Sequence, residues 1–234
     1  MIQPQIAVIT YNTPHRKTQD VLHGLKAKGY QNVKLYALPF VKRDNPFQPI
    51  YQHRPSKAID IEIETYAKNF GYDFELTTPD TLTAQLRKDQ PNYVLIAGAG
   101  LLPDELVESF KIINTHPGFL PKTRGLDSLK WAITKNVEVG VTTHFVDTEA
   151  DAGFLIEQRT VPVYSNDTFH SLAYRQYEIE IEMLVNSIEI IPTLSNFKSL
   201  STTAYEATRR MPKSIETDLM HAFEKYKATY KQDK

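Results

Sequence analysis

The stretch from Asn92 to His116, NYVLIAGAGLLPDELVESFKIINTH, decides the fold of this chain. It begins with the almost continuous apolar run NYVLIAGAG, continues through LPDELVESF, which has helical character, and ends with a second apolar run, KIINTH. Apolar runs of this kind are typical of strands buried on both faces of a parallel sheet. The order strand, helix, strand therefore predicts a doubly wound α/β fold, whose ligands bind at the carboxyl ends of the strands.

The same alternation extends toward the N-terminus. Residues 5–11 and 32–39 are short and rich in β-branched and aromatic residues, which indicates strands. Residues 16–29 lie between them, with a helical apolar face and a glycine at the end. Another helix is expected to begin at Pro79, directly after a threonine that can cap it.

Elsewhere the pattern changes. Residues 39–55 contain four prolines and no clear period, which predicts a long loop. Antiparallel strands are expected after residue 139, then a long helix beginning after Asp167 or Thr168 and a second apolar helical stripe from Ser214. We therefore predict a catalytic domain over 1–192 and a C-terminal helical extension over 193–234.

Composition excludes several classes of protein. The 234 residues include 27 Lys and Arg against 28 Asp and Glu, so there is no overall charge to favour nucleic acid or a membrane as partner. Cysteine is absent, which excludes disulfides and cysteine-ligated metals. Neither a signal peptide nor a membrane-length apolar run is visible, so we expect a cytoplasmic protein. The apolar stripes of the last two helices are compatible with a homo-oligomer and with intramolecular packing.

Asn114 and His116 are separated by one residue at the end of the second apolar run. Residues i and i+2 of a strand share a face, so both side chains are expected to point together at the carboxyl edge of the sheet. An Asn amide and a protonated His both donate hydrogen bonds and together could hold an oxyanion. Asp151 stands in an Ala/Gly turn, and a carboxylate near His116 would favour the charged imidazole.

From spacing alone, purely structural roles are also open. Asn-x-His in a strand and Asp before Ala-Gly are both common structural features. The G-x-G-x-x-G motif of NAD-dependent oxidoreductases is absent after the first strand. The seven His residues are dispersed without metal-ligand spacing, so no metal site is expected.

The motifs INTHPGFLPKTRG and VGVTTHFVDTEADAGFLI, with the distance between them, resemble the folate-dependent formyltransferase family over about residues 90–165. The resemblance implies a Rossmann-like formyltransferase core with a β/α C-terminal extension. It also implies that Asn114, His116 and Asp151 are catalytic and that 10-formyltetrahydrofolate is the formyl donor, with no metal. An amine of the acceptor would attack the formyl carbon, and Asp151 would keep His116 charged and help to move the proton through water.

The resemblance further implies which residues bind the folate. LIAGAGLLP is similar to the family segment whose backbone holds the pterin, and the turn before Asp151 is similar to its folate-binding loop. The expected folate-binding residues are Gly98, Leu101, Leu102, His144, Asp147 and Ala150.

Departures from individual branches bear on the acceptor. The purine-pathway branch has a Gly/Ser-rich turn after the first strand that holds a phosphate on a helix N-terminus, whereas TYNTPHRKTQD has no glycine. The methionyl-tRNA branch has a further β-barrel and a basic surface, and the formyltetrahydrofolate hydrolases have an additional regulatory domain, for which this chain has no room. The sugar N-formyltransferases fit in size, and EATRRMPK is similar to segments of that branch. The start TYNTPHRKTQDVL also resembles a pseudaminic-acid-type amino-sugar formyltransferase.

The expected acceptor is therefore an amino-deoxy sugar linked to a nucleoside diphosphate, used for surface polysaccharide. Glycinamide ribonucleotide, another small-molecule amine, and a non-catalytic folate- or nucleotide-sugar-binding protein are the alternatives. Cationic side chains can bind the diphosphate of such an acceptor, and polar side chains after the first strand can bind its sugar. The expected acceptor-binding residues are Tyr11, Asn12, Arg54, Lys122 and Arg124.

Overall fold

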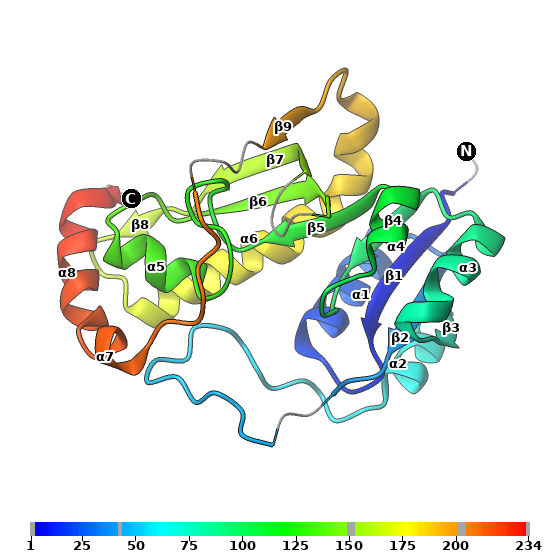
Figure 1. Cartoon of the computed structure of the whole chain (residues 1–234), viewed down its shortest axis with the longest axis horizontal. Helices are drawn as coiled ribbons and strands as arrows, with labels where there is room; N and C mark the ends of the chain where they lie inside the picture. The colour runs from blue at the N-terminus through cyan, green and yellow to red at the C-terminus, as the bar shows by residue number, and fades with distance from the viewer. Residues whose placement is uncertain (1–2, 42–43, 149–152, 201–204, 233–234) are drawn as a thin grey trace.

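The computed structural model describes residues 3–41, 44–148, 153–200 and 205–232. Its N-terminal half alternates strands and helices (Figure 1). The elements there are β1 (Ile6–Tyr11), α1 (Arg16–Ala27), β2 (Val33–Leu38), α2 (Ile63–Asn69), β3 (Asp73–Leu76), α3 (Pro79–Asp89), β4 (Tyr93–Ile96), α4 (Asp104–Ser109) and β5 (Ile112–His116).

The C-terminal half has one long helix among shorter elements. These are α5 (Ser128–Thr134), β6 (Gly140–Phe145), β7 (Gly153–Thr160), β8 (Val163–Tyr164), α6 (Phe169–Ile190), the 3₁₀ helix η1 (Ile191–Thr193), β9 (Lys198–Leu200), α7 (Lys213–Glu216), α8 (Leu219–Tyr230) and β10 (Lys231–Gln232).

One mixed sheet organises the molecule, in the order β3-β2-β1-β4-β5-β6-β7-β9. The pairs from β3 to β5 are parallel, and those from β5 through β6 and β7 to β9 are antiparallel. The predicted doubly wound α/β fold and the change to antiparallel strands after residue 139 are therefore confirmed. The carboxyl ends of β1, β2, β4 and β5 open onto one edge of this sheet.

Helices cover both faces of the parallel half. Apolar residues of α1, α2 and α6 pack with β1 and β2 on one face, whereas those of α3 and α4 pack on the other face. Helix α6 also runs beneath β5, β6 and β7 (Figure 1). Because α6 contacts both halves of the sheet, it fixes β5 relative to α1.

Residues 193–234 are built into the same body. Strand β9 pairs with β7 at the sheet edge, β10 pairs with β8, and α8 packs against α5. The apolar stripe of α8 is buried in that contact through Leu219, Phe223 and Tyr226. The tail is divided into α7 and α8 rather than one continuous helix. The boundary at residue 192 stays a prediction, as does a homo-oligomer.

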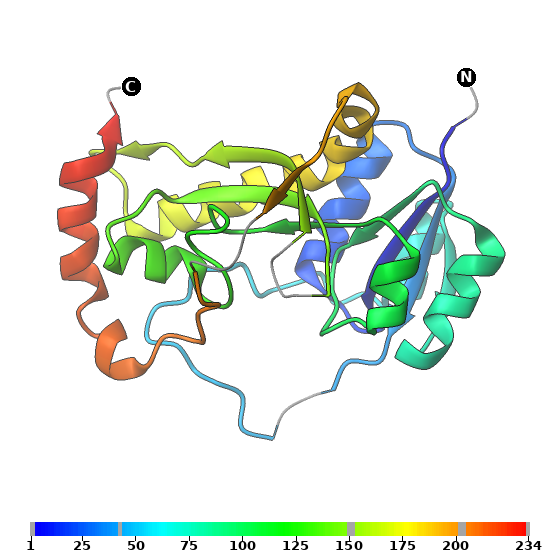
Figure 2. The same cartoon turned by 45° about the horizontal axis from the view of Figure 1, so that its top comes forward.

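The predicted loop is longer than expected. Residues 39–62, here called the long loop, have no helix or strand at their described positions, and Figure 2 shows them passing from β2 to the neighbourhood of α7. The side-chain amide of Gln19 on α1 donates to the carbonyl of Ile59 at 2.7 Å and accepts from its N–H at 2.8 Å. At the loop's centre, the Glu216 carboxylate accepts from the N–H groups of Ile50 and Tyr51 at 2.9 and 3.1 Å. These hydrogen bonds attach the centre of the long loop to α7 and its end to α1.

The start of α6 gives a prediction about pH. Thr168 caps the helix by accepting from the N–H of Ser171, as expected from the sequence. Burial alone would raise the pKa of neighbouring Asp167, but hydrogen bonds from Arg175, the N–H of Tyr164 and Ser171 lower this pKa to about 2. An unfolded Asp has a pKa near ~3.9, so the stabilisation is complete above that pH and is lost as pH falls from about 4 to 2.

We therefore expect the free energy of unfolding of the wild type to fall more steeply between about pH 5 and 2 than that of Asp167→Asn. Urea unfolding at several pH values measures both slopes. Parallel curves for the two proteins would contradict this assignment.

Candidate functional site

Four polar side chains share one face where β5 meets β6. The antiparallel register places Asn114 opposite His144 and His116 opposite Thr142. Since residues opposite each other in a sheet project from the same face, these four side chains form one cluster. Thr115 occupies the other face, where its hydroxyl lies 2.9 Å from that of Thr143. The strand geometry expected for Asn114 and His116 is therefore present.

His116 is held in a defined orientation. Its side chain is buried, with 5% exposed, and its Nε2 lies 2.7 Å from the carbonyl oxygen of Thr123. A carbonyl only accepts, so Nε2 carries a proton. Donation of a second hydrogen bond, to an oxyanion, requires Nδ1 to be protonated as well. The geometry thus calls for the imidazolium form if His116 is to stabilise negative charge.

The loop after β5 is fixed from both sides of the sheet. On one side, Thr142 Oγ1 donates to the carbonyl of Gly118 at 2.8 Å and accepts from the N–H of Leu120 at 3.1 Å. On the other, Gln176 of α6 donates to the carbonyls of Pro117 and Gly140 at 2.9 and 3.0 Å. Within the loop fixed in this way, the N–H and hydroxyl of Thr123 donate to the Phe119 carbonyl at 3.2 and 3.3 Å, which positions the Thr123 carbonyl that orients His116.

The expected folate-side residues surround this cluster only in part. His144 is buried, and its Nδ1 lies 3.2 Å from the carbonyl oxygen of Phe145. Asp147 accepts from the N–H of Thr148 at 2.7 Å and lines a second cavity, together with Phe145 and Phe197. Asp151 and Ala150 lie outside the described residues, so their roles stay predictions.

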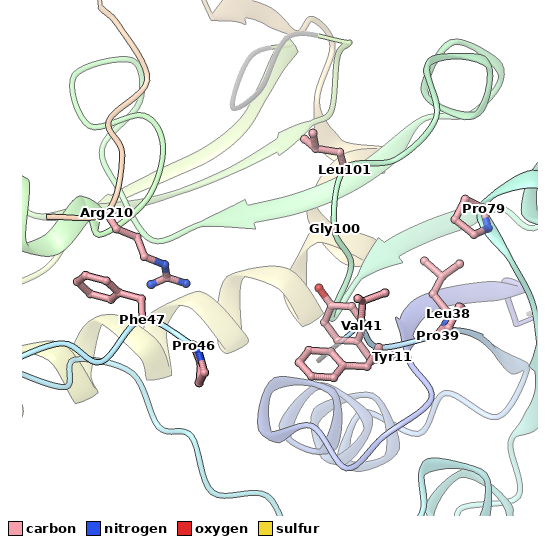
Figure 3. A pocket seen from close by; sticks show the side chains of 11 residues that line it. Tyr11, Leu38, Pro39, Val41, Pro46, Phe47, Pro79, Gly100, Leu101 and Arg210 are labelled. Atoms are coloured by element: carbon pink, nitrogen blue, oxygen red, sulfur yellow. The ribbon is translucent and has the colours of Figure 1, made fainter. Parts of the chain in front are cut away.

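A cleft of about 850 Å³ opens at the carboxyl ends of β1, β2 and β4 (Figure 3). Leu101, in the segment that follows β4, lines it with 94% of its surface exposed. The lining residues are Tyr11, Leu38, Pro39, Phe40, Val41, Pro46, Phe47, Pro79, Gly100, Leu101 and Arg210. Tyr11 and Leu101, assigned from sequence to acceptor and folate respectively, therefore face one common cavity. A Cβ added at Gly98 would lie 2.9 Å from atoms of both Tyr11 and His15, so Gly98 is close to these side chains, and Leu102 is partly buried against the core.

A charged cluster lies between α1, α6 and the long loop. The Glu180 carboxylate is 1% exposed and lies 2.8 Å from Lys17 Nζ and 2.6 Å from an Arg54 nitrogen. Burial would raise the pKa of Glu180, but these two cations lower that pKa to about 2. Lys17 Nζ also lies 3.5 Å from the carbonyl oxygen of Thr115, which places the cluster against β5.

His15 stands beside this cluster as a neutral ring. Burial, followed by the charges of Lys17 and Arg54, lowers the pKa of His15 to about 4. Its Nδ1 lies 3.0 Å from the hydroxyl of Thr18, and its ring meets that of Tyr11 edge to face at 5.5 Å. At neutral pH His15 therefore contributes hydrogen bonding and no charge.

The other expected acceptor-binding residues make contacts within the protein. Asn12 accepts from the N–H of Phe40 at 3.1 Å, and Arg54 pairs with Glu180. Lys122 lies 3.5 Å from Glu138 on the surface. Arg124 is 4% exposed and donates to the carbonyl of Tyr205 at 3.0 Å, so its buried guanidinium does not lie on an open surface. Of the five, Tyr11 is the residue brought to the cleft.

Sequence reasoning missed Arg210. Arg210 belongs to residues 205–211, here called the strap, which lie alongside the loop that follows β5. Thr208 exchanges backbone hydrogen bonds with Arg124 and Leu126 at 2.9 and 2.8 Å. Farther along the strap, the indole N–H of Trp131 donates to the carbonyl of Arg209 at 2.8 Å. The paired arginines of EATRRMPK were the available signal, but only the strap's attachment shows which one faces the cleft.

Gly125 allows the strap to approach this closely. It has φ +87°, and a Cβ there would lie 2.2 Å from the carbonyl oxygen of Thr208. We expect Gly125→Ala to destabilise the fold by well over the ~1 kcal/mol that a left-handed alanine costs. Gly29→Ala is the matched control, because Gly29 has φ +80° with nothing within 4 Å of an added Cβ. Thermal unfolding measures the stability of both variants. Equal losses of stability would show that the close approach of Gly125 to Thr208 adds nothing to the cost of an alanine.

Two further features of the described part of the chain bear on its function. Within it, no group of three or more His, Asp or Glu side chains could hold a metal ion. None of its helices combines the length and apolarity required to cross a membrane.

Comparison with known proteins gives a family. The model of the formyl transferase family matches residues 6–188. The chloroplastic phosphoribosylglycinamide formyltransferase of Vigna unguiculata is 37% identical over 123 residues, which are 49% of this chain and 39% of that protein. The phosphoribosylglycinamide formyltransferase of Bacillus subtilis is 30% identical over 130 residues, 54% of this chain and 67% of that protein. The chain thus matches well under half the length of the first relative and about two thirds of the second.

Solved structures share the fold. Glycinamide ribonucleotide transformylase 1 from Symbiobacterium toebii superposes with a TM-score of 0.61 at 22% identity, covering 85% of this chain and 95% of that one. A Mycobacterium tuberculosis chain provisionally assigned to the sugar N-formyltransferases superposes with a TM-score of 0.57 at 22% identity, covering 88% and 74%.

Proposed function

Because the chain belongs to the formyl transferase family, we propose that it transfers a formyl group from 10-formyltetrahydrofolate to the amine of a nucleotide-linked amino-deoxy sugar. The observation that carries this proposal is the shared face of Asn114 and His116 at the carboxyl end of β5. Donors fixed in this way stabilise charge without reorganising during the reaction.

The proposed chemistry uses few groups of the protein. As the acceptor amine adds to the formyl carbon, negative charge develops on the formyl oxygen. The Asn114 amide and Nδ1–H of the His116 imidazolium donate hydrogen bonds to that oxygen. We propose that Asp151 favours the charged form of His116 and passes the proton from the amine toward the folate nitrogen through water. The adduct then collapses with cleavage of the bond between the formyl carbon and the folate nitrogen.

The folate is proposed to bind where β4 ends beside β5. Strand β4 pairs with β5 through Val94 and Leu95, so the segment after it, including Gly98, Leu101 and Leu102, borders the catalytic strand. His144 stands opposite Asn114 on the same face. Asp147 and Ala150 complete the proposed folate-binding set.

Two observations support a nucleotide-linked sugar as acceptor. The turn between β1 and α1 contains no glycine, unlike the glycine-rich turns that hold a phosphate against a helix N-terminus. The adjoining cleft is lined mainly by aromatic and apolar side chains, which suits a larger and partly apolar acceptor.

Glycinamide ribonucleotide is the second candidate acceptor. The observation that favours it is the 30–37% identity to two enzymes named as phosphoribosylglycinamide formyltransferases. Binding would then have to use side chains near α1 in place of a glycine-rich turn.

An acceptor screen tests the proposal. Purified protein is mixed with 10-formyltetrahydrofolate and a panel of UDP- and dTDP-linked amino sugars, with glycinamide ribonucleotide included, and the products are analysed by mass spectrometry. A product heavier by one carbonyl group on an amino sugar supports the proposal and identifies the substrate. Formylation of glycinamide ribonucleotide alone would overturn the sugar assignment. Release of tetrahydrofolate without a formylated product would instead indicate hydrolysis.

A further inference from the structure

We infer that Arg210, presented by the strap, binds the diphosphate of a nucleoside diphosphate whose base lies among the aromatic side chains of the cleft. Only the identity of the group attached to that diphosphate, an amino sugar, rests on the proposed function. The binding of the nucleotide itself can be measured without formyl transfer.

Arg210 is placed in the cleft by the rigid backbone around it. On one side of it the Arg209 carbonyl accepts from Trp131, and on the other the N–H of Met211 donates to Asp127 Oδ2 at 2.9 Å. The side chain then points from the strap toward the middle of the cleft, beside Phe47 (Figure 3). Its guanidinium carbon lies 5.7 Å from the centre of the Phe47 ring.

Arg210 is paired with one carboxylate of the protein, that of Asp127, and keeps 46% of its side chain exposed. Its Nη1 lies 3.6 Å from Asp127 Oδ1, which is longer than a direct hydrogen bond. The nearby His53 lies 3.9 Å from the same oxygen, but burial and neighbouring cations lower the pKa of His53 to about 3, so its ring is neutral and Arg210 is the cation beside Asp127. Among the described residues that line the cleft, Arg210 is the charged one. An anion entering the cleft would therefore meet this guanidinium, whose planar fork suits phosphate oxygens.

The rest of the cleft fits a planar, partly apolar group. Tyr11 and Phe40 meet edge to face at 5.2 Å, and Phe40 remains half exposed. Phe47 lies across the cleft on the long loop, next to Arg210 (Figure 3). Exposed aromatic faces of this kind stack on nucleobases regardless of base identity. A volume of about 850 Å³ is within the range of sites for ligands of this size.

The arrangement also gives the ligand a direction. Gly100 and Leu101 line the cleft and belong to the segment that follows β4, the neighbour of β5. A sugar attached to a diphosphate at Arg210 could extend past this segment toward Asn114. This distinguishes a nucleoside diphosphate from a free phosphate, which would leave the aromatic side chains unused.

Titration calorimetry with UDP and dTDP as probes, and with uridine and inorganic pyrophosphate as partial ligands, tests the inference. We expect at least one nucleoside diphosphate to bind the wild type and Arg210→Gln to weaken that binding by about 10-fold or more, the scale of losing a charged hydrogen-bond donor. Arg209→Gln is the matched control, since Arg209 is the neighbouring exposed arginine and its side chain does not line the cleft. It should change the dissociation constant less than about 2-fold.

The partial ligands separate the two halves of the site. Both should bind more weakly than the complete nucleotide, and Arg210→Gln should weaken pyrophosphate but leave uridine unchanged. Absence of binding by UDP and dTDP, equal binding by wild type and Arg210→Gln, or equal losses in both arginine variants would overturn the inference. Nucleotide binding that depends on Arg210, in a protein that formylates no amine, would support the cleft assignment and refute the proposed function.

Discussion

Replacing His116 with alanine is expected to lower kcat by roughly 10²-fold or more, the scale of losing one preorganised donor to a developing oxyanion. The reason is geometric: the Thr123 carbonyl fixes the ring through Nε2, and Nδ1–H is the donor that we propose for the oxyanion. Asn114→Ala should cause a loss of similar size, because both side chains lie on the same face of β5. Steady-state kinetics with the acceptor identified in the screen measures both.

The accompanying binding measurements distinguish catalysis from folding. The dissociation constant for the folate should stay close to that of the wild type in both variants, and His221→Ala, on the exposed side of α8, should leave kcat unchanged. Full activity in both His116→Ala and Asn114→Ala would refute their assignment as catalytic residues.

Glu216→Gln is expected to lower the free energy of unfolding by about 3–5 kcal/mol, the cost of breaking a buried ion pair by removing one partner. Glu216 and Lys130 form a direct ion pair in which both side chains are 0% exposed. Burial would raise the pKa of Glu216, but Lys130 and the N–H groups of Ile50 and Tyr51 lower it. The amide of glutamine leaves the Lys130 ammonium buried without a counter-charge.

Urea unfolding of Glu216→Gln is best compared with Glu224→Gln. Glu224 also pairs with a lysine, Lys227 at 3.0 Å, but it is 67% exposed, so its loss should cost less than about 1 kcal/mol. The double variant Lys130→Met/Glu216→Leu should recover much of the stability, because neither charge is then left buried. Equal stabilities of the Glu216 and Glu224 variants would show that the pair contributes little.

The elements that the sequence predicts well are those whose core contacts make a regular pattern. Strand β4 is almost continuously apolar, β5 begins with the buried pair Ile112 and Ile113, and α6 is long enough for its stripe to repeat over several turns. The short elements α2, β3 and α5 were not predicted. Strand β3 lies at the sheet edge with two exposed and two half-buried residues, and α5 starts after Asp127 in a left-handed conformation with no capping hydrogen bond. Tertiary contacts determine such elements more than local preference does.

In the candidate site too, the features set by local sequence could be predicted and those set by tertiary contacts could not. The common face of Asn114 and His116 follows from the period of a strand, which is a local property. Which cations face the cleft could not be predicted, because partners far away in sequence determine where each charged side chain lies. Arg54 is paired with Glu180, and Arg124 donates to the Tyr205 carbonyl. Arg210 reaches the cleft only through the strap, so no local pattern could distinguish it from Arg209.

The attachment of the long loop to Glu216 has a consequence for the order of assembly. Ile50 is joined there to a residue 166 positions later in the chain. During synthesis, Ile50 is made long before Glu216, so this anchor cannot form until nearly the whole described chain has been synthesised. Contacts of such sequence separation also close slowly. The part of the long loop that carries Phe47 would therefore reach its final position among the last parts of the molecule. The cleft would become able to bind a ligand only after the core is complete.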